Sequence, residues 1–221
     1  MSDVPLPRRL LAEALGTAGL LIAVVGSGIM AQTLSPDNVG VALLANAIAT
    51  GCALYVLIAT LGPVSGAHFN PAVTLAFGLR REIGLRDGLA YGAVQIVAGA
   101  AGVIVAHAMF DQALLQVSDT PRGGPGAWIA EGVATFGLLL AIFGGLRHVP
   151  GQVPALVAIY ITGAYWFTAS TSFANPAVTI ARTLTDTFAG IAPLDAPGFI
   201  VAQIAAVGVA AIVIGAVFRR D

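Results

Sequence analysis

The chain has 221 residues, of which 57% are hydrophobic and only 10% are charged, and its mean hydropathy is +0.90. Because a soluble domain carries about 25% charged residues, this composition excludes an ordinary water-soluble fold. A net charge of −1 without any basic cluster also excludes nucleic acid as a partner.

Six apolar stretches are long enough to cross a lipid bilayer as helices. They cover residues 10–30, 41–61, 88–109, 127–146, 153–173 and 198–218. The second contains the only cysteine, Cys52, which excludes an internal disulfide and a cysteine-rich metal site; we expect a buried, inert thiol. The sequence therefore predicts an all-α membrane protein, with residues 1–221 as a single domain that has no metal site and no cofactor.

The arginines orient this bundle, because the chain has no lysine and cytoplasmic loops carry an excess of positive residues. If the N-terminus is cytoplasmic, two arginines fall outside, Arg122 and Arg182. The inner side then receives the other eight, which are Arg8, Arg9, Arg80, Arg81, Arg86, Arg147, Arg219 and Arg220. This distribution predicts that both termini are cytoplasmic.

The second half of the chain repeats the first. AEALGTAGLLIAVVG, from Ala12, returns as AEGVATFGLLLAIFG, from Ala130, and FNPAVTLA, from Phe69, returns as ANPAVTIA, from Ala174. The repeats cover residues 1–110 and 126–221, and each holds three spans. Since three is odd, the second repeat enters the membrane from the opposite side, and inverted repeats of this kind place a solute path between their halves.

Two short segments beginning with Asn-Pro-Ala are predicted to be half-helices that dip into the membrane. Asparagine is a good N-cap, and proline suits the first helical position. We expect the helices to end near residues 80 and 186, and about eleven residues span only about 16 Å, half of the hydrocarbon layer. The two motifs are Asn70, Pro71 and Ala72, and Asn175, Pro176 and Ala177.

With its duplicated motif and six spans, the chain resembles the aquaporin and aquaglyceroporin family. SGAHFNPAVT, from Ser65, is similar to that family's first signature almost letter for letter. The resemblance implies six transmembrane helices and two re-entrant half-helices in a passive channel for small neutral solutes, assembled as a homotetramer. It also implies that Glu13 and Glu131 brace the re-entrant loops rather than relay protons, and that His68 supports the first loop rather than gating it.

The physical reading of the motifs agrees with a channel of this kind. The two half-helix N-termini each carry about half a positive charge, which opposes cations and protons at the centre of the pore. The side-chain amides of Asn70 and Asn175 would donate hydrogen bonds to a passing oxygen. The extended segments 66–69 and 171–174 would line the pore with carbonyl acceptors.

The residue after the second motif departs from the family pattern, because it is Val178 where most members have a filter arginine. Arg182, one turn further on, offers one way to refill the space of that arginine. Its Cα is displaced by about 6 Å along the half-helix, however, so we expect it to pair with Asp186 instead. Spacing within the resemblance gives the filter as Thr50, Gly163, Ser172 and Val178, a wide and mildly polar set with neither an aromatic ring nor a charge. The sequence leaves open whether Tyr165 or Trp166 narrows it.

A filter without arginine resembles a bacterial subgroup of aquaglyceroporin-like channels associated with arsenic resistance. This implies passive permeation of metalloid acids such as arsenite, of glycerol-like polyols and of water, in a bacterial inner membrane. The alternatives are a water-selective or a glycerol-selective aquaporin, a weakly selective ion channel and a secondary transporter. No arrangement of residues suggests an enzyme.

Overall fold

The computed structural model describes residues 4–218, and it is all-helical over that range. Arg219 and Arg220, two of the inner arginines in the orientation argument, lie outside the described residues. In chain order the elements are α1 (Leu6–Leu34), α2 (Val39–Ser65), α3 (Pro71–Leu79), α4 (Leu85–Met109), α5 (Pro125–His148), the short 3₁₀ helix η1 (Pro150–Gln152), α6 (Val153–Phe167), α7 (Pro176–Arg182) and α8 (Ala196–Val217).

Five helices, α1, α2, α4, α5 and α8, are long and apolar enough to cross a membrane. The sixth span, α6, has 15 residues and ends at Phe167, so the prediction that it continues to residue 173 was wrong. Thr168 leaves the helix in an extended conformation, and its hydroxyl donates to the Ala164 carbonyl at 2.6 Å, which satisfies the last turn. The residues that follow belong to a re-entrant loop, and the predicted fold class is confirmed.

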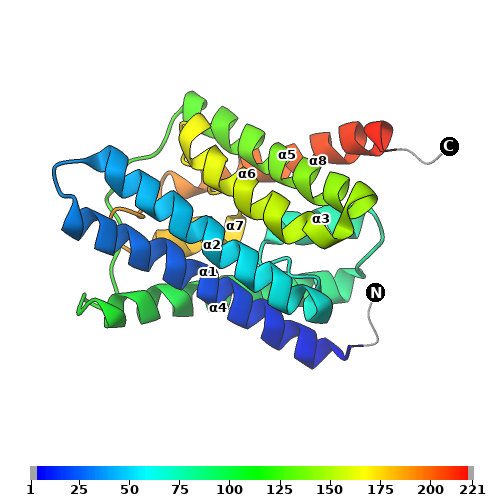
Figure 1. Ribbon diagram of the computed structural model, residues 1–221, viewed down its shortest axis with the longest axis horizontal. Helices are drawn as coiled ribbons and strands as arrows, with labels where there is room; N and C mark the ends of the chain where they lie inside the picture. Colours follow the sequence, from blue (N-terminus) through cyan, green and yellow to red (C-terminus); the bar gives the residue numbers. More distant parts are fainter. Residues whose placement is uncertain (1–3, 219–221) are drawn as a thin grey trace.

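The helices pack as two similar halves. In the first half α1 contacts α2 and α4, and in the second α5 contacts α6 and α8 in the same pattern. The halves meet where α2 lies against α6, where α3 lies against α8 and where α7 lies against α4. Figure 1 shows the start of α1 and the end of α8 on the same side of the bundle.

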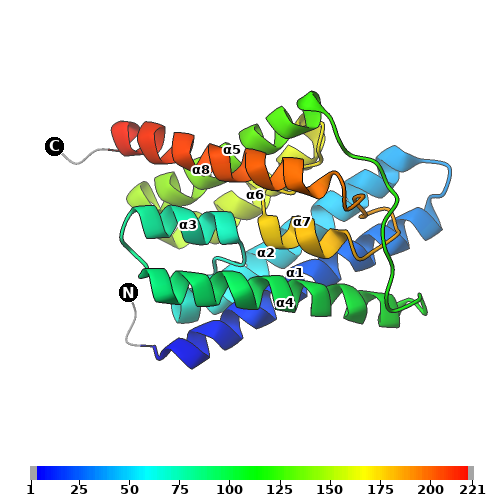
Figure 2. The ribbon, with the colours of Figure 1, turned by 180° about the vertical axis from the view of Figure 1, so that it is seen from behind.

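The half-helices α3 and α7 lie between the long helices, with their N-terminal ends toward each other (Figure 2). Each begins at the proline of its motif, and the side chain of the preceding asparagine caps it. The predicted end of α3 is correct to within one residue, but α7 ends at Arg182 rather than near Asp186. Its last turn is closed by Thr183, whose hydroxyl donates to the Ile180 carbonyl at 2.7 Å.

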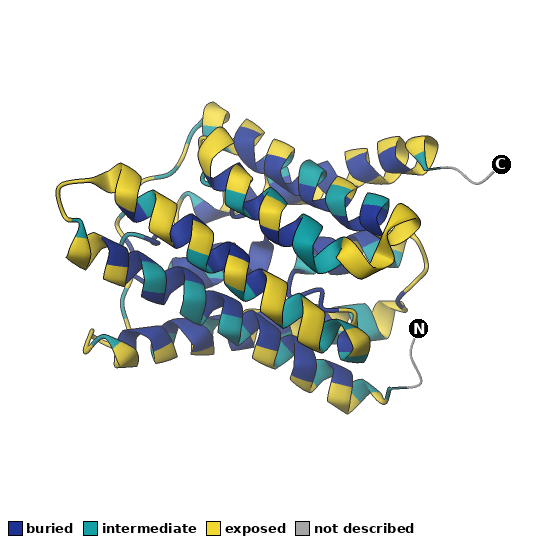
Figure 3. Cartoon of the chain, viewed as in Figure 1, coloured by how far each residue is buried: buried dark blue, intermediate teal, exposed yellow. Residues whose placement is uncertain are grey.

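Burial is distributed as expected for a protein surrounded by lipid. Figure 3 shows buried residues facing the interior of the bundle and exposed residues along the outer faces of the long helices, and many of the exposed residues are large and apolar. Cys52 lies on the exposed face of α2, so the expectation of a buried thiol was wrong. Its neighbour Gly51 faces inward instead, because adjacent residues of a helix point about 100° apart.

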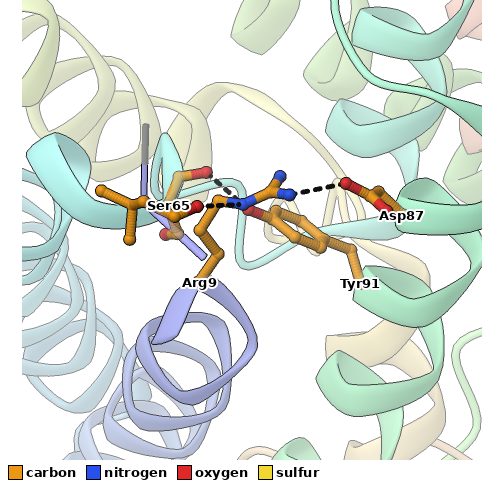
Figure 4. A network of polar contacts seen from close by, with 5 residues as sticks. Arg9, Ser65, Asp87 and Tyr91 are labelled. Atoms are coloured by element: carbon orange, nitrogen blue, oxygen red, sulfur yellow. Dashed lines mark hydrogen bonds and ion pairs between the residues drawn. The ribbon is translucent and has the colours of Figure 1, made fainter. Parts of the chain in front are cut away.

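A polar network ties three helices together near the end of the bundle where α1 begins (Figure 4). The buried guanidinium of Arg9 donates to the Asp87 carboxylate at 2.6 Å. Beside it the Tyr91 hydroxyl donates to the Ser65 carbonyl at 2.9 Å. These contacts join α1, α2 and α4 immediately before the first re-entrant loop begins.

Candidate functional site

A cavity of about 180 Å³ runs between the two halves of the bundle. It is lined along one face of α6 by Val153, Val157, Ile161 and Tyr165, which are spaced four residues apart. Twelve residues of helix extend about 18 Å, so the cavity follows most of the length of α6. Residues of both re-entrant loops and both motif asparagines also line it.

At the centre of the cavity the two asparagines make reciprocal hydrogen bonds. The Asn70 Nδ2 donates to the Ala174 carbonyl at 2.7 Å, and the Asn175 Nδ2 donates to the Phe69 carbonyl at 2.8 Å. Each side-chain oxygen accepts from its own half-helix, from Ala72 N and Ala177 N at 2.8 and 2.9 Å. Because an amide nitrogen has two donor hydrogens, each asparagine has one hydrogen beyond the bond to the opposite loop.

The re-entrant loops share an unusual backbone. Ala67 and Phe69 in the first loop have φ of 50° and 48°, and the matching residues of the second, Ser172 and Ala174, have φ of 53° and 48°. Non-glycine residues rarely adopt this left-handed region, which costs about 1–3 kcal/mol each and persists only where the surroundings impose it. Both halves contain the same strained turn, which indicates that the surrounding structure holds the peptide groups of each loop in one direction.

Glu13 holds the first loop in this conformation by accepting hydrogen bonds from it. Its Oε1 accepts from the Ser65 hydroxyl at 2.7 Å and from the His68 amide at 2.9 Å. Its Oε2 accepts from the Phe69 amide at 2.7 Å and from Gln95 at 2.8 Å. With four donors around one buried carboxylate, the amides of His68 and Phe69 are satisfied, while the loop residues themselves line the cavity.

Glu131 repeats this arrangement in the second half. It accepts from the amides of Phe173 and Ala174, both at 2.8 Å, and from Gln203 at 2.5 Å. Both glutamates are completely buried and face the loops rather than the cavity. Neither lines the cavity, and each binds the backbone of its own re-entrant loop.

His68 lies against the cavity wall in the first loop. Its ring stacks on Phe77 with centroids 4.5 Å apart, and its Nδ1 is 3.1 Å from the Thr74 hydroxyl. Both contacts fix the ring against α3, so the histidine is packed rather than free to swing. It has no counterpart in the second loop, where the matching residue is Phe173.

The end of the cavity farther from the Arg9 network, here the outer end, holds three of the four predicted filter residues. Thr50, Ser172 and Val178 are buried and line the cavity together. Tyr165 joins them, and its hydroxyl lies 3.2 Å from the Thr50 hydroxyl, linking α6 to α2. An aromatic side chain is therefore present in the lining of this end, which answers for Tyr165 the question that the sequence left open.

Gly163 does not lie with the others. It is exposed on the outer face of α6, where an added Cβ would lie 3.7 Å from the Phe167 ring. Gly163 and Tyr165 are two residues apart on α6, and two residues turn a helix by about 200°, so they lie on opposite faces. Tyr165 takes the place that was expected of Gly163, while Trp166 is 51% exposed and points away.

Arg182 also differs from its prediction. It makes no ion pair with Asp186 within residues 4–218. The guanidinium is instead buried at the outer end of the cavity, where its Nε donates to the Ala189 carbonyl and its carbon lies 3.4 Å from the centre of the Phe173 ring. Asp186 is exposed and accepts from the Asp119 amide at 3.3 Å.

Comparison with known proteins identifies the family. The model of the family described as "Major intrinsic protein" matches residues 1–165 of the chain. The chain belongs to the major intrinsic protein family. It is therefore a membrane channel for small solutes and not an enzyme.

Individual relatives agree with this family. The channel is 54% identical to aquaglyceroporin AqpS of Rhizobium meliloti (strain 1021) over 204 residues, which are 92% of this chain and 87% of the relative. It is 33% identical to aquaporin-5 of Mus musculus over 172 residues, 69% of this chain and 63% of the relative. The X-ray structure of the aquaglyceroporin from Plasmodium falciparum matches with a TM-score of 0.72 at 20% identity, covering 97% of this chain and 99% of that one, and shows the same fold.

Two residues of the channel's outer end were missed or misjudged from the sequence. Tyr165 was considered only as an uncertain neighbour, and Arg182 was assigned to a surface ion pair. A signal for Tyr165 exists in the four-residue apolar spacing that begins at Val153, because this spacing marks one face of α6. Nothing comparable in the sequence indicates the direction of Arg182, since its position depends on the loop that follows α7.

Proposed function

We propose that this channel passes small uncharged solutes, namely metalloid acids such as arsenite, glycerol-like polyols and water. The single observation that carries the proposal is a cavity between the two halves that both motif asparagines line. Asn70 and Asn175 have amide hydrogens beyond those in their reciprocal bonds, and the backbone carbonyls of the lining loops would serve as acceptors. Most of the other lining residues are apolar, so they offer a solute few groups to bind tightly.

A neutral, hydroxyl-rich solute fits this lining best. Each hydroxyl group can accept from an asparagine and donate to a loop carbonyl, which replaces the water that it leaves behind. An ion would lose its hydration without gaining a counter-charge, and the half-helix N-termini add a positive field against cations. The lining therefore supports a passive channel over an ion channel.

The residue Val178 supports solutes larger than water. Its side chain lies where most members of the family carry the much longer arginine, and it lines the cavity beside Ser172. We assign the outer filter to Thr50, Tyr165, Ser172 and Val178, in place of the set that included Gly163. The relative AqpS is named as an aquaglyceroporin, which favours polyol-sized permeants over water alone.

The setting follows from the same observations. We propose a bacterial inner membrane, because a relative that is 54% identical comes from a bacterium, and we propose that both termini are cytoplasmic. The start of α1 and the end of α8 on one side of the bundle support this common location. We also propose a homotetramer, and the exposed apolar side chains on the long helices offer surface for contacts with lipid and with other subunits.

Flux into proteoliposomes tests the function. Purified channel should raise the uptake of arsenite and glycerol above that of empty liposomes and should speed osmotic shrinkage, without raising sodium uptake. Water flux alone, without glycerol or arsenite, would replace the proposal with a water-selective channel. A saturable uptake that needs an ion gradient would indicate a secondary transporter instead.

A further inference from the structure

Arg182 places a positive charge in the lining of the cavity without an ion-pair partner among residues 4–218. The residue is 2% exposed, and no ion pair within residues 4–218 involves it. Burial of an unpaired charge is costly, and ionisable residues at membrane depth usually face a water-filled path and serve function. The guanidinium is held by the Ala189 carbonyl and the face of the Phe173 ring, neither of which neutralises it.

The donors of Arg182 are only partly used. Among the hydrogen bonds of the described residues, its Nε alone has a protein acceptor. The two Nη atoms carry four further hydrogens, and they do not belong to the enclosed polar atoms that lack a partner. Because Arg182 lines the cavity, we infer that these hydrogens are accessible from the space through which a solute would pass.

We propose that Arg182 is a specificity-determining residue of the outer filter, acting from one helical turn beyond the position that Val178 occupies. Its Nη groups bind the hydroxyl oxygens of polyols and neutral oxyacids, and its charge repels cations. This inference rests on the proposed function, since it takes the cavity as the solute path. One turn displaces its Cα about 6 Å along α7. In this channel Arg182 therefore supplies the charge of the filter, while the smaller Val178 sets its width.

Arg122 provides a matched control. Its guanidinium lies 5.5 Å from the same Phe173 ring and donates to the carbonyls of Gly190 and Phe188 at 2.6 and 3.0 Å. It holds the same outer loop that supports Arg182, but it does not line the cavity. A change at Arg122 therefore tests for damage to the loop, without removing a charge from the solute path.

The experiment compares Arg182→Met, Arg182→Lys and Arg122→Met with the unaltered channel in proteoliposomes, measuring sodium and glycerol uptake. Arg182→Met should raise sodium uptake about tenfold or more, because the barrier from a fixed charge in a narrow path disappears. Arg182→Lys should keep sodium uptake within about twofold of the original, since it retains the charge. Arg122→Met should leave sodium excluded.

Three outcomes would overturn the assignment. They are an unchanged sodium uptake for Arg182→Met in correctly assembled protein, an equal leak in Arg182→Met and Arg182→Lys, and an equal leak in Arg122→Met. If Arg182→Met does not assemble, the double variant Val178→Arg with Arg182→Val is measured instead. It removes the charge at position 182 and places one at position 178, one helical turn closer to the centre of the channel. It should exclude sodium while slowing glycerol, and a sodium leak from it would contradict the proposal.

The same measurements separate this inference from the function on which it rests. Glycerol and arsenite uptake by the unaltered channel tests the solute path. The ratio of sodium uptake between Arg182→Met and Arg182→Lys tests the charge. A channel that passes solutes but shows no difference between these variants would retain its proposed function and lose the role of Arg182.

Discussion

The two halves of the chain contribute equally to the centre of the pore but unequally to its outer end. At the centre each half contributes the same parts: an asparagine, a strained loop and a buried glutamate with a glutamine beside it. At the outer end the second half supplies Tyr165, Ser172, Val178 and Arg182, while the first half supplies Thr50 alone among the polar side chains. The internal repeat therefore determines the centre, and we propose that selectivity arises at the outer end, where the two halves differ.

This difference suggests a division of labour between the two regions. A symmetric centre presents the same donors and the same helix fields to a solute from either side, which suits the exclusion of ions in both directions. An asymmetric end can vary one side chain at a time without disturbing the loops. Substitutions at the centre should thus act in matched pairs, whereas substitutions at the outer end should act singly.

The largest expected effect is on stability, at the two glutamate braces. Glu13→Gln and Glu131→Gln each replace an accepting oxygen by an NH₂ group that faces loop amides. The loss of charged hydrogen bonds and the unsatisfied donors should cost about 3 kcal/mol or more in each case. Thermal unfolding in detergent should show similar decreases of Tm for both.

Glu82→Gln is the control for this pair, because Glu82 is exposed and makes a surface ion pair with Arg80 at 2.7 Å. Surface pairs contribute about 0–1 kcal/mol, so its Tm should hardly change. A large decrease for one brace and none for the other would break the symmetry claimed for the centre.

The next effect concerns charge at the centre. Asn70→Asp and Asn175→Asp replace the donor by a carboxylate oxygen that faces a carbonyl and attracts cations. Each should reduce glycerol uptake and raise sodium uptake by about tenfold, to a similar extent in the two variants. Asn38→Asp, at the exposed N-cap of α2, should behave as the original, because aspartate caps equally well. Unequal leaks from the two centre variants would mean that one half dominates the barrier.

A moderate effect is expected at Val178. Val178→Arg restores a long cationic side chain and should slow glycerol and arsenite about tenfold, while water flux should fall by less than about threefold. Val178→Leu adds volume without charge and should slow the larger solutes only slightly. Equal reductions of water and glycerol by Val178→Arg would count against Val178 as the residue that sets the width.

The smallest effect is expected at Tyr165. Tyr165→Phe removes the contact with the Thr50 hydroxyl across the cavity and should cost about 1 kcal/mol of stability, with a glycerol flux raised less than about twofold. Tyr160→Phe is the matched control. The Tyr160 hydroxyl donates to the Val133 carbonyl at a distance of 3.2 Å, and Tyr160 does not line the cavity. If both variants conduct alike, the Thr50–Tyr165 contact does not shape the filter.

The centre could be predicted from the sequence because its signals are local. Asn70 and Asn175 cap the helices that follow them, and the prolines fix where those helices begin. The repeat then placed each element twice. The outer end could not be predicted as well, because the facing side of α6 and the direction of Arg182 depend on the loops around them. An error of two residues was enough to exchange Gly163 for Tyr165.

The reciprocal hydrogen bonds between the halves also constrain how the protein is made. The Asn70 side chain needs the carbonyl of Ala174, and Phe69 offers its carbonyl to Asn175, a residue that leaves the ribosome more than a hundred positions later. The first loop is thus synthesised well before the partner that locks it. Glu13 can hold that loop in the meantime, since all its donors come from the first repeat. The first re-entrant loop can therefore adopt its conformation in the membrane before the second half is synthesised and completes the pore.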